Sequence, residues 1–560
     1  MTNRRVQLTR RLSLGEEQLF LLLAILIGVY SGFAVVLFRL TIQFVQVAVF
    51  GTSLTPAAAR VVLAPAAAGL LVAVVVERWF PTVRGSGVNQ TKAALYVYDG
   101  YISFRTVIGK FLTSAVAIGS GHSLGPEDPS LQIGAGLASA LGRRLALSRE
   151  RLRYIAPVGA AAGLAAAFNS PITAVLFVIE EVIGRWTAGV LGAVVLAAVS
   201  SVVTEQWFLG DQPLFHVPAY HLVHAAELLA YAAIGLIGGG VSLAFVKTVA
   251  ALRPRFRSLP SWTWYLQPAI AGLLVGAIGT RFPHVMGAGY TYIDQAMHDQ
   301  YTWRVLAAVC ALKVVTTAAS FTSGTPGGLF APTLFIGAML GATICAVERL
   351  IAPGATGPMG AYALVGMGAL FAGILRAPMT SVFMIVEVSG NYTIILPVMI
   401  ANTIAYVISR RFQPQPLFDV LSRQDGIELP SMEEEREVEV RSVADAMRPG
   451  AAVRVDADTS PAAALAKMSE SGTATLLVLL QSGEWGALTR EQLESAGDAA
   501  TVADLAAPLP RPYLYPDQSV ETALRALHGQ PVVPVVHRAN AGALEGVLTM
   551  DDLIGALGRE

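Results

Sequence analysis

Charge and cysteine are both scarce in this chain. Only 14% of its 560 residues are charged, the formal net charge is zero, and there are two cysteines. A formal net charge of zero gives no indication of nucleic-acid binding, so no nucleic-acid partner is expected. Cys310 and Cys345 both lie in apolar segments, where a free thiol behaves as a small hydrophobic group. We therefore expect no disulfide framework.

Patterns of metal-dependent catalysis are also missing. None of the eight histidines is followed by glutamate, which excludes the helical His-Glu-x-x-His zinc site of membrane metalloproteases. His221 and His224 could share one face of a helix, but no third ligand is evident, so no metal site is expected. Acidic residues are few in the apolar segments, which disfavours a divalent-cation channel. We do not expect an enzyme.

Long hydrophobic segments dominate the chain, and 54% of its residues are hydrophobic. Between Glu17 and Arg60 the only charge is Arg39, so this segment exceeds the roughly 20 apolar residues that cross a bilayer. Residues 1–14 are predicted to be a cytoplasmic tail, because the positive-inside bias is satisfied by Arg4, Arg5, Arg10 and Arg11. We expect an integral protein of a lipid bilayer, and the compact loops favour a bacterial inner (plasma) membrane.

Glycine and proline interrupt the apolar segments in pairs, as in transporters that contain broken helices. This pattern predicts an all-α polytopic membrane domain over residues 15–425. An acidic linker is expected over residues 426–439. From residue 440 onward the composition is typical of a soluble α/β tail.

An internal repeat divides the membrane part. An offset of 207 residues places Pro171 on Pro378, an offset of 203 residues places Pro129 on Pro332, and further identical pairs flank both prolines. Two nearly equal offsets in the same order predict homologous halves. The halves span about 15–210 and 220–425, and the functional site is expected at their interface.

Two carboxylates, Glu127 and Asp128, interrupt the apolar segment GSGHSLGPEDPSLQIGAG at 119–136. A charge at membrane depth is costly and is by default a functional candidate. A helix is predicted from Leu131, and the free N–H groups at a helix start can hold an anion. The second copy, SGTPGGLFAPTLFIG at 323–337, has glycines and no acid there. The pattern predicts an anion site at which an ionised carboxylate competes with the anion.

Four motifs resemble those of the CLC family of chloride channels and proton-coupled chloride transporters. In chain order they are GSGVN at 85–89, GPEDP at 125–129, GGLFAP at 327–332 and NYTIILP at 391–397. The resemblance covers about residues 15–425. It implies two inverted repeats of broken helices and a homodimer in which each subunit has its own pore. It also implies chloride and protons as substrates, with no cofactor required.

The resemblance implies an anion cradle drawn from both halves. Ser86 and Tyr392 would donate their hydroxyl groups to the central anion. Backbone N–H groups of the second copy would complete the cradle, at Gly328, Leu329, Phe330 and Ala331. Glu127 would be the gating glutamate, whose ionised side chain fills an anion position and whose protonated form swings out. The simpler alternatives are a helix N-cap for Ser86 and an interfacial aromatic for Tyr392.

Glu181 matches the inner proton glutamate of the family's transporters, at a position where its channels generally carry an apolar residue. The resemblance therefore favours a proton-coupled chloride antiporter, and a passive chloride channel gated by Glu127 is the alternative. Glu181 could instead be a helix-end charge paired with Arg185. Glu180, repeated as Glu387, is predicted to be structural because both halves keep it.

Several positions depart from the family's pattern or leave two interpretations. Pro126 and Asp128 flank the gating glutamate where Arg and Gly are common, and repulsion from Asp128 could raise the apparent proton affinity of the pair. Asn89 replaces the usual proline of the first motif. Lys110 resembles a buried family lysine that adds positive potential near the anion path, and an ordinary snorkelling lysine is the alternative.

The soluble tail contains a second repeat. Aligning Ser460 with Ser519 brings two helix starts together, and each copy has the predicted order strand, helix, strand, strand, helix. The tail resembles a pair of CBS modules, at 440–498 and 499–560.

CBS pairs commonly bind adenine nucleotides in the cleft between the copies. The GVLTMDD segment of the second copy offers Thr549 and Asp552, whereas Gln492 stands where the acid would be in the first copy. At most one nucleotide site is expected, with regulation from the cytoplasmic side. A purely structural or dimerising tail is the alternative.

Overall fold

The computed structural model describes residues 16–51, 57–145, 147–184, 188–211, 213–215, 217, 227–353, 356–431, 442–496, 501–528 and 530–557. The chain forms two compact units, Met1–Glu435 and Arg436–Glu560, and each is considered by itself. Several residues discussed above lie outside the described residues: the tail 1–14, Arg185, His221, His224 and residues 432–439 of the expected linker.

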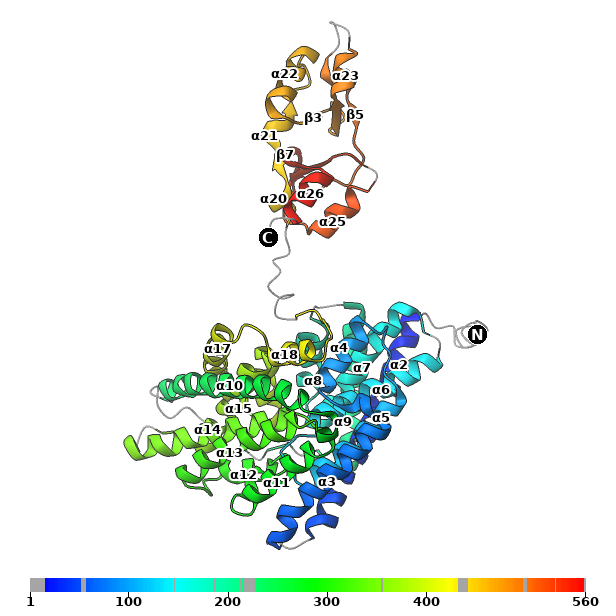
Figure 1. The fold of residues 1–560 in the computed structure, drawn as a ribbon. Coiled ribbons are helices and arrows are strands. Elements are labelled where there is room, and N and C mark those ends of the chain that lie inside the picture. The colour runs from blue at the N-terminus through cyan, green and yellow to red at the C-terminus, as the bar shows by residue number, and fades with distance from the viewer. Residues whose placement is uncertain are drawn as a thin grey trace. The chain divides into compact units, whose positions relative to one another are not determined.

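The first unit is helical, and its elements follow the two halves of the repeat (Figure 1). The first half contains α2 (Glu16–Phe50), α3 (Ala58–Trp79), η1 (Pro81–Val83), α4 (Gly87–Tyr96), α5 (Phe104–Gly119), α6 (Glu127–Arg144), α7 (Arg149–Phe168), α8 (Pro171–Phe177), η2 (Val178–Ile183) and α9 (Ala188–Leu209). The second half contains α10 (Glu227–Arg257), η3 (Ser261–Tyr265), α11 (Gln267–Gly279), η4 (Pro283–Val285), α12 (Tyr290–Met297), α13 (Trp303–Thr322), α14 (Phe330–Ile351), α15 (Met359–Leu375), α16 (Pro378–Ser389), η5 (Tyr392–Ile394), α17 (Ile395–Phe412) and α18 (Leu417–Gln424).

This unit contains both long and short helices. Within the described residues, seven helical segments are long and apolar enough to cross a bilayer. Others, such as α4, α12 and α16, are too short to span. Short helices that start and stop inside the unit place helix ends, with their unpaired backbone groups, at depth.

Corresponding glycines set the helix packing in the two halves. α6 packs against α7, and α14 packs against α15. A Cβ built on Gly134 would lie 2.2 Å from the carbonyl oxygen of Gly159, and one built on Gly337 would lie 2.3 Å from that of Gly366. These distances leave no room for a side chain, so each crossing requires glycine.

The halves join through the loops before α6 and α14. The N–H of Gly125 donates to the carbonyl of Gly328, and the N–H of Gly328 donates to the carbonyl of Gly125, both at 2.8 Å. These residues correspond at the 203-residue offset, so an approximate twofold axis passes between them. α6 begins at Glu127, four residues before the predicted start at Leu131, because acidic residues and proline are favourable in a first turn.

Glu180 and Glu387 form a second reciprocal link. Glu180 Oε2 accepts from the N–H and the hydroxyl of Thr380, at 2.9 and 2.6 Å. Glu387 Oε2 accepts from the N–H and the hydroxyl of Thr173, at 2.6 and 2.5 Å. Each carboxylate thus caps a helix start in the other half, which gives both a structural role.

The second unit contains two small sheets with strand orders β2-β3-β4-β5 and β1-β7-β6. Its elements are α20 (Val443–Ala446), β1 (Arg448–Pro449), α21 (Gly450–Val453), β2 (Arg454–Val455), α22 (Pro461–Ser471), β3 (Thr475–Leu479), β4 (Trp485–Thr489), α23 (Arg490–Glu494), α24 (Val502–Leu505), β5 (Ala507–Pro508), α25 (Val520–Ala526), β6 (Val533–His537), β7 (Asn540–Leu548) and α26 (Met550–Leu557).

The two copies in this unit exchange short strands. β1 precedes the first copy's helix but pairs with β7 of the second, and β5 begins the second copy but pairs with β4 of the first. The expected division at residues 498 and 499 therefore does not separate two independent sheets. Ser460 and Ser519 are the N-caps of α22 and α25, as the repeat predicted.

Candidate functional site

Three helix starts meet at one buried place in the first unit: those of α4, α6 and α14. The side chains of Ser86, Glu127, Asp128, Leu329 and Phe330 are each at most 2% exposed. Gly328 and Ala331 are buried beside them. Except for Tyr392, the structure thus brings together the residues expected to hold and gate an anion.

The Glu127 carboxylate lies on the start of α14. Its Oε2 accepts from the backbone N–H of Ala331 at 3.2 Å, and the hydroxyl of Tyr290 donates to its Oε1. A free helix start is a favourable position for an anion. The side chain therefore occupies donors that an inorganic anion would otherwise use.

The Asp128 carboxylate lies on the start of α4. Its Oδ1 accepts from the backbone N–H of Val88 at 3.0 Å. The same N–H donates to Oγ of Ser86, the N-cap of this helix, at 3.1 Å. Ser86 is thus a helix N-cap as well as a neighbour of the acidic pair.

Lys110 holds the loop that leads to Ser86. Its Nζ donates to the carbonyl oxygens of Val83 and Gly85, at 3.1 and 2.9 Å. At the 203-residue offset, Lys313 does the same for the second half, donating to two carbonyl oxygens at 3.0 and 2.7 Å. Both lysines have 0% exposure, so the snorkelling interpretation of Lys110 is wrong.

Tyr392 does not belong to the cradle. Its side chain is 75% exposed at the start of η5, whereas the cradle residues are buried. The motif NYTIILP places this tyrosine in a short helical turn directly before α17. The prediction that its phenol binds the anion is therefore corrected, and the interfacial alternative fits better.

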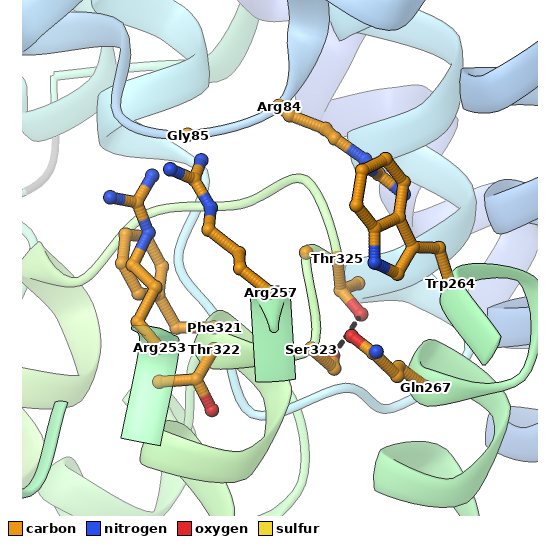
Figure 2. A pocket seen from close by; sticks show the side chains of 11 residues that line it. Arg84, Gly85, Arg253, Arg257, Trp264, Gln267, Phe321, Thr322, Ser323 and Thr325 are labelled. Atoms are coloured by element: carbon orange, nitrogen blue, oxygen red, sulfur yellow. Dashed lines mark hydrogen bonds between the residues drawn. The ribbon is translucent and has the colours of Figure 1, made fainter. Parts of the chain in front are cut away.

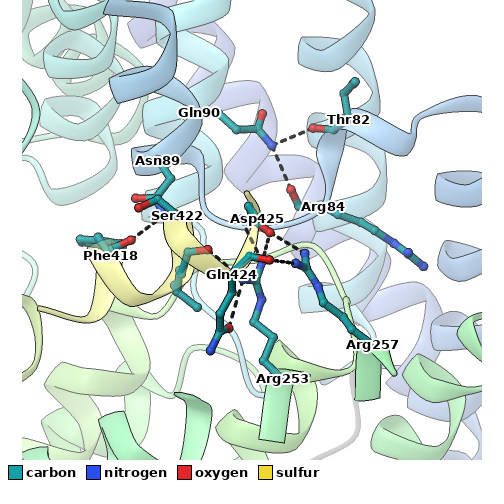
Figure 3. Close-up of polar contacts among 12 residues, drawn as sticks. Thr82, Arg84, Asn89, Gln90, Arg253, Arg257, Phe418, Ser422, Gln424 and Asp425 are labelled. Atoms are coloured by element: carbon teal, nitrogen blue, oxygen red, sulfur yellow. Dashed lines mark hydrogen bonds and ion pairs between the residues drawn. The ribbon is translucent and has the colours of Figure 1, made fainter. Parts of the chain in front are cut away.

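Phe418, on α18, lies beside Phe330 of the cradle. Its ring centroid is 6.3 Å from that of Phe330, and its backbone carbonyl accepts from the buried amide of Asn89 at 2.8 Å. Asn89, at the unusual position of the first motif, thus joins α4 to α18 (Figure 3). A phenylalanine here supplies packing but no hydroxyl donor.

Glu181 forms a buried ion pair. Nζ of Lys92 lies 2.7 Å from Glu181 Oε1 and 3.6 Å from Asp419 Oδ1. Lys92 follows Ser86 on α4, so the helix that starts at the cradle also holds the inner carboxylate. The alternative partner Arg185 lies outside the described residues.

Arginines surround a polar cavity beside Gly85 (Figure 2). Arg253 and Arg257 lie 2.9 and 2.6 Å from Asp425, and Arg84 pairs with Glu77. Figure 3 shows that Asp425 and the α18 backbone accept hydrogen bonds from the guanidinium groups of Arg253 and Arg257. Three cations facing two carboxylates leave a positive excess, which attracts anions.

The expected nucleotide residues of the tail contact each other. Asp552 Oδ2 accepts from the N–H and the hydroxyl of Thr549, at 3.0 and 2.6 Å. Asp552 Oδ1 also lies 2.6 Å from Arg448 Nε. Asp552 is the residue expected to bind the ribose of a nucleotide. Both of its carboxylate oxygens therefore already have partners within the protein.

The sequence reasoning missed Tyr290, Lys92 and Asp419. Tyr290 could have been identified from the repeat. An offset of 202 places the glycines of the first motif, Gly85 and Gly87, on two glycines just before Tyr290. Lys92 gave no such signal, because the same offset places it on Asp294, and Asp419 lies after the last motif.

The chain is similar to proteins of known families. A family model described as "Voltage gated chloride channel" matches residues 68–410, and a CBS domain model matches residues 502–559. A putative chloride channel protein ClcB-like of Ralstonia nicotianae is 35% identical over 351 residues, which cover 62% of this chain and 81% of that protein. An H(+)/Cl(-) exchange transporter ClcA of Salmonella arizonae is 30% identical over 442 residues, covering 76% and 93%.

Two solved structures share the fold. A slow cyanobacterial Cl-/H+ antiporter has a TM-score of 0.67 and 23% identity, and the match covers 72% of this chain and 97% of that one. A eukaryotic CLC transporter has a TM-score of 0.64 and 21% identity, covering 95% and 97%.

Proposed function

This chain belongs to the CLC family of voltage gated chloride channels, and we propose that it is a proton-coupled chloride antiporter. The observation that carries this proposal is the position of Glu127, whose carboxylate accepts from the Ala331 N–H at 3.2 Å. An ionised carboxylate and chloride compete for the same donors. A proton on Glu127 removes its charge and weakens its hold, so proton uptake and chloride entry are linked.

Glu181 is the proposed inner proton carboxylate. It is 2% exposed and lies in η2, directly after α8. The rings of Phe177, at the end of α8, and Phe330, at the start of α14, lie 5.0 Å apart. This contact links the segment that leads to Glu181 with the helix start on which the Glu127 carboxylate lies. A proton crossing this apolar contact needs transient water, which is a slower step than direct transfer.

A passive chloride channel is the second candidate, and the Lys92 contact favours it. A proton can use Glu181 only if the ion pair at 2.7 Å breaks or rearranges, and separating a buried pair is costly. If that pair never opens, Glu127 gates chloride without coupled proton transfer.

Flux measurements in liposomes separate the two candidates. Purified wild type, Glu181→Gln and the control Tyr392→Phe are reconstituted under a chloride gradient with the membrane potential clamped. For an antiporter, wild type and Tyr392→Phe move protons uphill, and Glu181→Gln moves chloride without protons. Chloride flux without coupled protons in the wild type would make the protein a channel.

We also propose a homodimer with the N-terminus and the tail in the cytoplasm, in a bacterial inner membrane. Light scattering of the protein in detergent should give twice the mass of one chain. Protease added to inside-out vesicles should cleave the tail, and protease added to intact cells should not.

For the tail, we propose that an adenine nucleotide binds by displacing Arg448 from Asp552. Calorimetry with ATP should show tighter binding to Arg448→Ala than to the wild type, and loss of binding to Asp552→Ala. Equal heats of ATP binding for the wild type and both variants would favour a purely structural or dimerising tail.

A further inference from the structure

We propose that Asp128 is a second gating carboxylate, which occupies the anion position at the start of α4 as Glu127 occupies the one at the start of α14. The inference rests on the proposed transport of chloride. In this arrangement the two successive carboxylates of α6 block two different helix starts, and chloride must displace both to pass.

The contacts of Asp128 are those of a bound anion. Its side chain is 1% exposed, and its Oδ1 lies 3.0 Å from the N–H of Val88. The same oxygen lies against Gly87, since a Cβ built on Gly87 would be 2.7 Å from it. A serine hydroxyl and backbone N–H groups at one helix start are the donors that a chloride ion would use.

Capping α4 does not explain a buried acid here. Ser86 already caps the helix, since its Oγ accepts from the Val88 N–H at 3.1 Å. Asp128 therefore adds a second acceptor to a donor that has one. Burying a carboxylate costs free energy, and a redundant hydrogen bond does not explain that cost. Occupation of an anion site does explain why a carboxylate is buried here.

The charged neighbours of Asp128 come from several elements. Lys110 on α5 supplies the positive charge that acts on it, and Glu127 precedes it on α6. The second half has no such acid, because the residue corresponding to Asp128 at the 203-residue offset is Ala331. The residue corresponding to Ser86, at an offset of 202, is Ala288. Hydroxyl and carboxylate thus occur together in one half and are both absent from the other.

Chloride binding to the purified full-length protein tests this role. Isothermal titration with chloride would compare wild type with Asp128→Asn, which keeps an acceptor oxygen, and Asp128→Ala, which copies the second half. We expect both variants to bind chloride about tenfold more tightly, because the competing negative charge is gone. Glu127→Gln should tighten binding independently, and the double variant Glu127→Gln with Asp128→Asn should bind more tightly than either single variant.

A merely structural Asp128 would give a different result. Asp128→Ala would then lower the melting temperature, Asp128→Asn would restore it, and neither would tighten chloride binding. That result, or chloride dissociation constants that stay within about twofold of the wild type in both variants, would overturn the proposal. Proton coupling does not enter this measurement, so tighter binding in a protein that moves no protons would reject only the antiporter function.

Discussion

At the start of α6 the first half carries Glu127 and Asp128, whereas at the start of α14 the second half carries Phe330 and Ala331. The loops before these helices nevertheless pair with each other through reciprocal 2.8 Å hydrogen bonds. The same backbone therefore serves two purposes. One copy supplies carboxylates, and the other supplies the N–H group that donates to one of those carboxylates.

This difference separates what the fold requires from what transport requires. Both halves have glycines at helix crossings, a lysine that donates to loop carbonyl groups, and a glutamate that caps a helix of the other half. The acids and Ser86 occur in one half only. Substitutions at shared positions should therefore have matched effects on stability, and substitutions at unshared positions should change transport.

The largest effect is expected at the shared glycines. Gly134→Ala and Gly337→Ala should each lower the free energy of unfolding by ~3 kcal/mol, because the new methyl group meets a backbone carbonyl. The control is Gly240→Ala in α10, where a Cβ has no neighbour within 4 Å. Thermal unfolding in detergent measures the three variants. If either crossing variant melted like the control, the matched packing of the halves would be wrong.

The two buried lysines should give the next effect. Lys110→Met and Lys313→Met each leave two carbonyl groups without their donor, which should cost ~2 kcal/mol of stability. Only Lys110 also acts on Asp128. Chloride titration should therefore show a change in affinity for Lys110→Met and none for Lys313→Met. Equal changes in affinity would mean that the two lysines act alike on the anion path.

The reciprocal caps provide a smaller and symmetric test. Glu180→Gln and Glu387→Gln should each lower the free energy of unfolding by ~1 kcal/mol, because a charged acceptor at a helix start becomes neutral. Unfolding of the purified variants should give the same loss within error. A much larger loss of proton flux for Glu180→Gln than for Glu387→Gln would instead give Glu180 a role in transport.

The smallest effect is expected at the tyrosines. Tyr290→Phe removes the hydroxyl that donates to Glu127, and the loss of one such hydrogen bond should change the chloride dependence of flux about fivefold. Tyr392→Phe should change nothing, because that side chain is 75% exposed. A flux defect in Tyr392→Phe would restore the original motif-based assignment.

Much of the architecture was predictable because it depends on local chemistry and on repetition. Proline at a helix start, glycine at a crossing and serine before a helix each have a local signature, and the repeat doubled every signal. The start of α6 was placed four residues late, because the apolar pattern begins at Leu131 while the helix includes the acidic first turn. The exchange of β1 and β5 in the tail carried no local signal, because two-residue strands are too short to have a pattern.

The chemistry around the site was only partly predictable. Glu127, Asp128 and Ser86 were identified from their motifs, and they do lie together. Tyr392 was assigned from a motif that resembles the family's, but its side chain is exposed.

The sequence by itself determined the repeat, the approximate places where helices start inside the membrane unit and the presence of two adjacent acids near one of those starts. Only the tertiary structure decided which donors those acids meet: Asp128 contacts a residue 40 positions away, and Glu127 one 204 positions away. It also paired Glu181 with Lys92, 89 positions away. Local preferences act over a few residues, whereas these contacts depend on how distant segments pack, within the first half for Asp128 and Glu181 and between the halves for Glu127.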